Sequence, residues 1–185
     1  RLITMQVPND HTAGPRPADG YPYRHSYVAD NDLAIGRILP FFSRTPYLKH
    51  MLVVITEDDP QGGVDHIDAH RSVLMLAGPY VKKGYTSHVH ANFGSILKTI
   101  YTILNVPYVN QYDATATLLQ DFFTDHPDFT PYTLVFPSKE VFDTQQAMKR
   151  YHKNTDWRKI LKGPEMDDEG EQREEHYKQQ NSLKK

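Results

Sequence analysis

Seven side chains that can bind a metal ion or transfer a proton lie close together in the middle of this 185-residue chain. They are Glu57, Asp58 and Asp59, followed by Asp65, His66, Asp68 and His70. Adjacent carboxylates repel one another, and one of them takes up a proton unless a positive charge compensates. A divalent cation supplies that charge. Carboxylate oxygens suit magnesium, calcium and manganese, and imidazole nitrogens move the preference toward manganese, iron or zinc. The sequence therefore predicts a divalent-metal site, with manganese, zinc, calcium and magnesium all open as its metal.

The residues on either side of the acidic triplet Glu57–Asp59 favour a site over a solvated loop. Taken alone, such a triplet is typical of a solvated loop or a helix cap. Here it follows the apolar, β-branched run Met51–Thr56, which is typical of a strand buried in a parallel sheet. A turn at Gly62–Gly63 comes next, and the His/Asp cluster follows it. Open α/β sheets bind ligands at the carboxyl ends of their strands, so we expect a functional site here.

The first residues of the chain repeat this arrangement. Leu2–Val7 is predicted to be a strand, and Asp10 and His11 follow its end. Two successive strand ends can project ligands toward one crevice, which makes Asp10 and His11 candidates for the same site. Asn9 and Asp10 are also ordinary turn residues, because their side chains bond to the nearby backbone. Both interpretations stay open.

Tyr27–Ser43 is predicted to be a helix. Its apolar residues include neighbours at helical spacing, and Asp30 or Asn31 is a suitable cap for its start. Pro40 is expected to kink or shorten this helix. We interpret the acidic run Asp30–Asp32 as structural, because acids are favoured in the first turn of a helix.

A second helix is predicted over Phe93–Leu104, with an apolar stripe of helical period and Asn92 as its N-cap. His88 and His90 lie just ahead of it, and helix N-termini suit anions. These two histidines are therefore candidates for contacting a substrate, with an ordinary surface loop as the equal alternative.

The remaining elements carry one more candidate, Arg71. It precedes a predicted strand, and its guanidinium fork suits either a substrate phosphate or the nearby carboxylates. The other expected elements are the strand Ser72–Ala77, a short helix over Leu118–Phe123, an edge strand over Phe129–Phe136 and a helix over Val141–Tyr151.

Composition limits the classes of function. A net charge of -2 gives no basic field for nucleic acid or an anionic membrane, and no apolar run approaches the length of a membrane span. Cysteine is absent, which removes disulfides, thiolate catalysis and sulfur-bound zinc. A mean hydropathy of -0.64 is low for a wholly compact domain. We assign the solvated part to residues 137–185, a charged tail that is helical or partly disordered.

With these residues in view, the chain resembles a phosphoesterase family of the alkaline phosphatase superfamily, which includes bacterial phospholipases C and a class of acid phosphatases. The matching segments are Pro8–Thr12, Ala29–Asp32, Thr56–Asp59 with Gly62–Gly63, Asp65–His66, Asp68–Arg71 and Asn110–Ala114. The resemblance is strongest to the branch that is often joined to a β-propeller in bacterial secreted proteins. It covers roughly Leu2–Thr124.

The resemblance implies an α/β/α sandwich with a mostly parallel sheet over residues 1–136, and metal-dependent hydrolysis of a small-molecule or lipid phosphate ester. It implies Asp58 and Asp59 as metal ligands, to which we add Asp10 and His70 as candidates. His11 and His66 are expected to be catalytic, and Arg71, His88 and His90 to contact the substrate. The resemblance also implies a periplasmic or extracellular location.

One part of the family pattern is missing. Family members carry their first metal ligands and a Ser or Thr nucleophile in an N-terminal half, and neither Thr12 nor Ser72 has the strand-to-helix setting of such a nucleophile. We therefore expect an upstream half of the domain, with a β-propeller as a further possible part of the same polypeptide. The alternatives are a non-catalytic metal-binding or partner-docking module, and a sulfatase or phosphonate hydrolase on a related fold.

Overall fold

A computed structural model describes residues 1–11, 15–58, 71–143 and 145, with the side chains of Asp10 and His11 left out. The chain divides into two compact units. The first unit contains Arg1–Thr4, Thr45–Ile55 and Leu74–Thr130, and the second contains the rest. Each unit is built around one of the two long helices, so we describe them separately.

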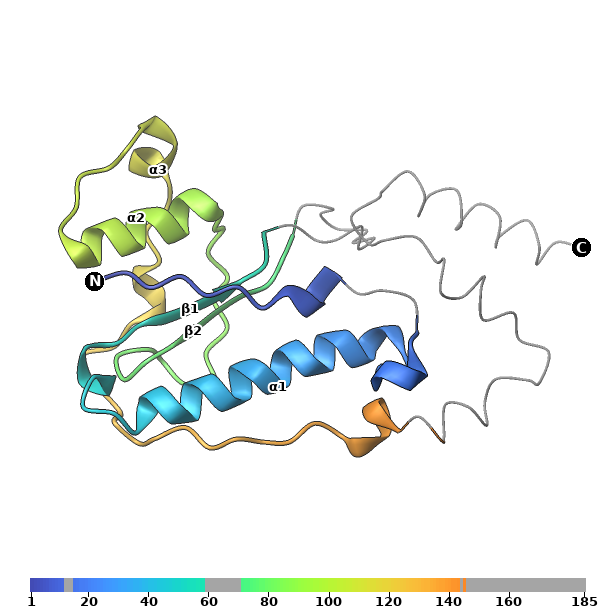
Figure 1. The fold of residues 1–185 in the computed structure, drawn as a ribbon. Helices are drawn as coiled ribbons and strands as arrows, with labels where there is room; N and C mark the ends of the chain where they lie inside the picture. The colour runs from blue at the N-terminus through green and yellow to red at the C-terminus, as the bar shows by residue number, and fades with distance from the viewer. Residues whose placement is uncertain (12–14, 59–70, 144, 146–185) are drawn as a thin grey trace, which may run out of the picture. The chain divides into compact units, whose positions relative to one another are not determined.

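A two-stranded antiparallel sheet, made of β1 (Val53–Thr56) and β2 (Leu74–Ala77), belongs to the first unit except for Thr56 (Figure 1). A short 3-10 turn, Leu48–His50, precedes β1, and Leu48 is buried. In β2, Met75 is half exposed, whereas its neighbours Leu74 and Leu76, on the other face of the strand, are partly buried. This alternation is typical of a sheet that is covered on one face, and it differs from the strands buried on both faces that we predicted from the apolar runs.

Two helices complete the first unit, α2 (Phe93–Leu104) and α3 (Gln111–Thr115), and they pack against each other. Asn92 caps α2, because its Oδ1 accepts from the Ser95 backbone N at 3.1 Å. The predicted bounds and cap of α2 are both confirmed. A 3-10 turn at Gln120–Phe122 replaces the predicted helix over Leu118–Phe123.

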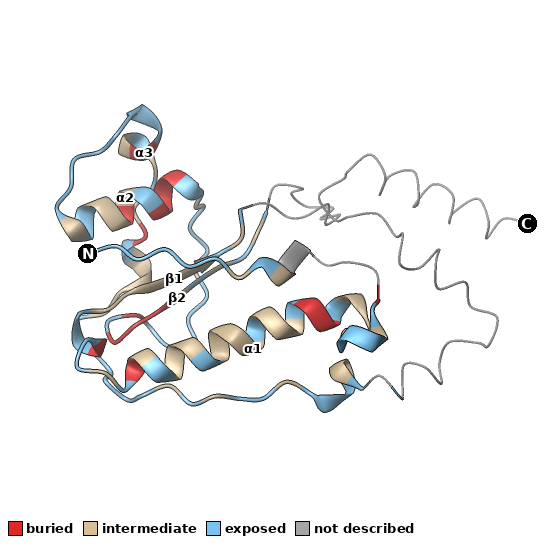
Figure 2. Cartoon of the chain, viewed as in Figure 1, coloured by how far each residue is buried: buried red, intermediate tan, exposed pale blue. Residues whose placement is uncertain are grey.

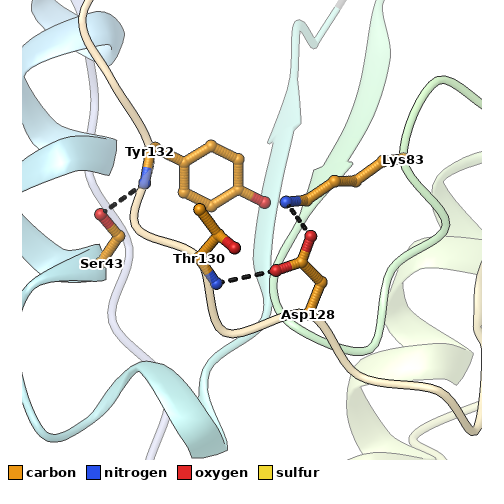
Figure 3. Close-up of polar contacts among 5 residues, drawn as sticks. All are labelled: Ser43, Lys83, Asp128, Thr130 and Tyr132. Carbon is orange, nitrogen blue, oxygen red and sulfur yellow. Dashed lines mark hydrogen bonds and ion pairs between the residues drawn. The ribbon is translucent and has the colours of Figure 1, made fainter.

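The core of the first unit is small and includes polar groups. Its largest fully buried side chain is Leu119, and the buried residues of α2 lie in its first two turns (Figure 2). The Thr99 hydroxyl has two hydrogen-bond partners within this core: it donates to the Ser95 carbonyl at 2.7 Å and accepts from the Leu119 backbone N at 3.1 Å. Buried polar groups need such partners to avoid a desolvation cost. In a surface loop of the same unit, Asp128 pairs with Lys83 and accepts from the Thr130 backbone N at 2.8 Å (Figure 3).

Asp113 of α3 is fully buried and holds the start of its own helix. Its carboxylate accepts from the backbone N of Val109 at 2.9 Å and of Asn110 at 3.0 Å. Burial raises the pKa of Asp113, but these donors outweigh burial, so its pKa lies below the ordinary value. A carboxylate whose pKa is lowered by folding stabilises the fold above its unfolded pKa of about 3.9, and that stabilisation is lost as the pH falls through the lower folded pKa.

We therefore expect Asp113→Asn to lower the free energy of unfolding at neutral pH, and to cost less as the pH falls below about 4, where the native carboxyl becomes protonated. Urea unfolding of both proteins at several pH values measures this difference. Asp125→Asn is the matched control, because that carboxylate is 92% exposed. A difference between Asp113→Asn and the native protein that stayed constant from neutral to acidic pH would contradict this account.

The second unit is built on α1 (Arg24–Ser43), a 20-residue helix. The helix begins three residues before the predicted start and continues three residues past Pro40. Asp30 and Asn31 therefore lie in its second and third turns, and the prediction that one of them caps the helix is wrong. The start is set instead near Tyr23, whose backbone N donates to Ser26 Oγ at 3.1 Å.

An extended segment from Pro131 to the 3-10 turn Lys139–Phe142 runs along α1 (Figure 1). Two buried serines near the ends of α1 bind this segment. Ser26 Oγ donates to the Val141 carbonyl at 2.5 Å, and Ser43 Oγ accepts from the Tyr132 backbone N at 2.9 Å (Figure 3). Between these two serines, a Cβ on Gly36 would lie 2.9 Å from Leu134 Cδ1. The absence of a side chain at Gly36 therefore leaves room for Leu134 of the extended segment.

Mixed helix and strand are confirmed, but three details of the predicted α/β architecture are not. The one described sheet is antiparallel rather than parallel. Leu2–Val7 forms no strand in the described part of the chain, and Leu2, Ile3 and Met5 are exposed. Phe129–Phe136 forms no strand either, because its second part lies along α1. The predicted helix over Val141–Tyr151 falls mostly outside the described residues, and no helix among those described could span a membrane.

Candidate functional site

The sequence segment with most of the candidate ligands, residues 58–71, is flanked by two residues that contact each other. Glu57 follows the last residue of β1, and Ser72 lies two residues before β2. Ser72 Oγ donates to the Glu57 carbonyl at 3.0 Å. Glu57 and Ser72, which flank the sequence segment 58–71 with its candidate ligands, are therefore in direct contact. Ser72, which we considered as a hydroxyl near the cluster, thus has a structural contact.

Few of the residues in this segment are described. Asp58 is exposed and Glu57 is partly buried at the end of β1, and Arg71 is exposed at the far end of the segment. The other candidates of the segment lie outside the described residues: Asp59, Asp65, His66, Asp68 and His70. Within the described part of the chain, no three His, Asp or Glu side chains form a group that could hold a metal ion.

The segment with Asp10 and His11 forms a short 3-10 turn, Pro8–His11, that is fastened to α1. The Asn9 backbone N donates to Asn31 Oδ1 at 3.1 Å, and Asn9 Nδ2 donates to Asp30 Oδ2 at 2.7 Å. Asn31 Nδ2 in turn donates to the Val7 carbonyl at 3.0 Å. Two motifs that carry the family resemblance, Pro8–Thr12 and Ala29–Asp32, are therefore bonded to each other across more than 20 residues.

Tyr21 completes this contact, and no pattern in the sequence had singled it out. Its hydroxyl donates to Asp30 Oδ2 at 3.1 Å and accepts from Asn9 Nδ2 at 3.1 Å. The Tyr21 ring stacks on the buried ring of Tyr27, with centroids 4.2 Å apart, which fixes the hydroxyl. Burial and the hydrogen bond to Asp30 raise the pKa of Tyr21, so the phenol stays protonated and can donate.

We interpreted Asp30 as a helix-capping or first-turn acid and Asn9 as a turn residue. In the structure the two side chains are instead hydrogen-bonded to each other. The only sequence signal was their presence in two of the segments that carry the resemblance. Because the pairing joins distant segments, no local pattern predicts it.

His88 and His90 belong to the first unit, whereas Asp58, Arg71 and the turn Pro8–His11 belong to the second. Both histidines are exposed, in a loop that leads to the N-cap of α2. Ser87 fixes this loop, since its Oγ donates to Asp121 Oδ2 at 2.5 Å and accepts from the Val89 backbone N at 3.2 Å. The position of His88 and His90 ahead of the helix is thus as predicted, and their contact with a substrate stays a prediction.

Comparison of the chain with protein-family models, with curated proteins and with solved structures found no match.

Proposed function

We propose that this chain carries the metal-binding part of a metal-dependent phosphoric ester hydrolase, of the phosphatase or phospholipase C type. The observation that supports this most is the hydrogen bond from Ser72 to the Glu57 carbonyl. It brings together Glu57 and Ser72, which flank the sequence segment that contains Asp58, Asp59, His66 and His70. A contact between the residues that flank a segment removes conformational freedom that ligand binding would otherwise have to remove.

The chemistry of the donor set fits a divalent cation. Asp58 and Asp59 are adjacent carboxylates at the end of a strand, and we assign them as metal ligands together with Asp10 and His70. Oxygen ligands with added imidazole favour manganese, zinc, calcium or magnesium. When bound, such an ion offsets negative charge on phosphoryl oxygens.

The chain's own residues do the remaining work in this proposal. His11 and His66 orient the phosphate or move protons, for which an imidazole pKa of about 6.5 is suitable. Arg71 binds phosphoryl oxygens through two parallel hydrogen bonds, a geometry that suits its planar fork. His88 and His90 contact the substrate beside the N-terminus of α2. Electrostatic stabilisation and positioning supply most of the rate.

The finer features of the proposal rest on the family resemblance. They are an α/β/α sandwich with a mostly parallel sheet, an upstream half that supplies the hydroxyl nucleophile, a β-propeller in the same polypeptide, and a periplasmic or extracellular location. The substrate is a small-molecule or lipid phosphate ester.

Hydrolysis assays test the function directly. The full-length natural protein is assayed with para-nitrophenyl phosphate and bis(para-nitrophenyl) phosphate, after removal of metal and after addition of manganese, zinc, calcium or magnesium. We expect turnover of at least one ester that is lost with the metal and restored by one ion. Metal binding without turnover under any of these conditions would favour the alternative, a non-catalytic metal-binding or docking module.

A further inference from the structure

We propose that Asp30 and Asn31 of α1 are positioning residues for the turn Pro8–His11, and that through this turn they set the metal affinity of the site. The proposal rests on the function proposed above, because it takes Asp10 as a metal ligand and His11 as a catalytic group. Neither Asp30 nor Asn31 is itself assigned as a ligand.

The first support is the number of hydrogen bonds directed at one short turn. Asn31 forms hydrogen bonds to the backbone on either side of Pro8: its Oδ1 accepts from the Asn9 backbone N, and its Nδ2 donates to the Val7 carbonyl. Asp30 holds the Asn9 side chain at 2.7 Å. The backbone on either side of Pro8 and the side chain of Asn9 are thus fixed to a single helix, immediately before Asp10.

The second support is that the Asp30 carboxylate is itself held in place. Its Oδ2 accepts from Asn9 Nδ2 and from the Tyr21 hydroxyl, and that hydroxyl is fixed by the stacking of Tyr21 on Tyr27. Charged acceptors make stronger hydrogen bonds than neutral ones. A network of this kind is stiffer than a single bond and transmits the position of α1 to the turn.

Groups behind metal ligands orient those ligands, and their loss typically costs about 10- to 100-fold in metal affinity. The arrangement here fits that role, because Asp10 directly follows the residue that Asp30 and Asn31 hold. The next acid along α1, Asp32, is exposed and offers a matched comparison with the same change of charge on the same helix.

The experiment compares Asp30→Asn, Asp32→Asn and Tyr21→Phe in the full chain. Manganese affinity is measured by the electron spin resonance signal of free Mn²⁺. The environment of His11 is read without metal from the NMR signals of its imidazole, and thermal unfolding reports on stability. We expect Asp30→Asn to weaken Mn²⁺ binding about tenfold and to shift the His11 signals. Tyr21→Phe should have a smaller effect in the same direction, and Asp32→Asn should change affinity less than twofold.

The outcomes separate this proposal from the proposed function. If Asp30→Asn lowers the unfolding temperature but leaves Mn²⁺ affinity and the His11 signals like those of Asp32→Asn, the residues are only structural and the positioning role is overturned. If the parent chain binds no Mn²⁺, the His11 signals decide. Without Mn²⁺ binding the metal site and the role in metal affinity both fail; signals shifted by Asp30→Asn alone then support positioning of the turn, and unshifted signals overturn positioning as well.

Discussion

Replacing Asp58 by asparagine in the full-length natural protein is expected to lower kcat/KM for phosphate-ester hydrolysis by about 10³-fold, which is typical of losing a main electrostatic contact to the transition state. Asp58 is exposed two residues past the end of β1, so the change removes charge without opening a cavity in a core. The amide has nearly the same shape but no charge, and it is a weaker ligand for hard cations.

Two further measurements make this result specific. Asp125→Asn changes the same charge at a side chain that is 92% exposed, and it should leave kcat/KM within a factor of two. Metal content should fall in Asp58→Asn and recover in part at high metal concentration, because the remaining ligands are intact. Unchanged metal content together with an unchanged rate would remove Asp58 from the site.

The second large effect is expected at Gly78, which follows β2. A Cβ at this position would lie 2.6 Å from the Met51 carbonyl oxygen and 3.5 Å from Leu52 Cα, both of which are backbone atoms. Backbone cannot swing aside as a long side chain can, so Gly78→Ala must displace the residues that lead into β1. The φ angle of +156° adds strain for any residue with a Cβ. We expect a loss of about 3 kcal/mol in the free energy of unfolding.

Gly84→Ala is the matched control for that prediction. Its φ is +62°, and a Cβ there would meet nothing within 4 Å, so only the left-handed backbone should cost stability, by about 1 kcal/mol. Urea unfolding of both variants separates steric conflict from backbone strain. Equal losses in the two variants would show that contact with Met51 does not matter.

Local signals predicted α2 well and α1 less well, and the difference has a physical cause. In α2 the apolar stripe, the Asn92 cap and the end at Leu104 are all encoded within one stretch of chain. The start of α1 depends on Ser26, whose hydroxyl is held by Val141, 115 residues further along. Strands depend still more on partners, and Leu2–Val7 has strand-forming residues without forming a strand in the described structure.

The candidate site follows the same rule. The sequence identified Asp58, the turn with Asp10 and His11, and the loop with His88 and His90 as chemically notable. It assigned Asn9 and Asp30 to local roles, because their contact joins residues 21 positions apart. The contact between Ser72 and Glu57 was also not predicted, since it depends on β2 pairing with β1. Residue types can therefore suggest a site, whereas pairing between distant segments decides how it is held.

Metal titration tests the central claim most directly, and it needs only this chain. Binding of manganese, zinc and calcium is measured by calorimetry for the parent and for the double variant Asp58→Asn with Asp59→Asn. We expect saturable binding of at least one of these ions by the parent and its loss in the double variant, with both proteins folded by circular dichroism. Equal binding by the two proteins, at any level, would contradict the assignment of Asp58 and Asp59 as the metal ligands of this chain.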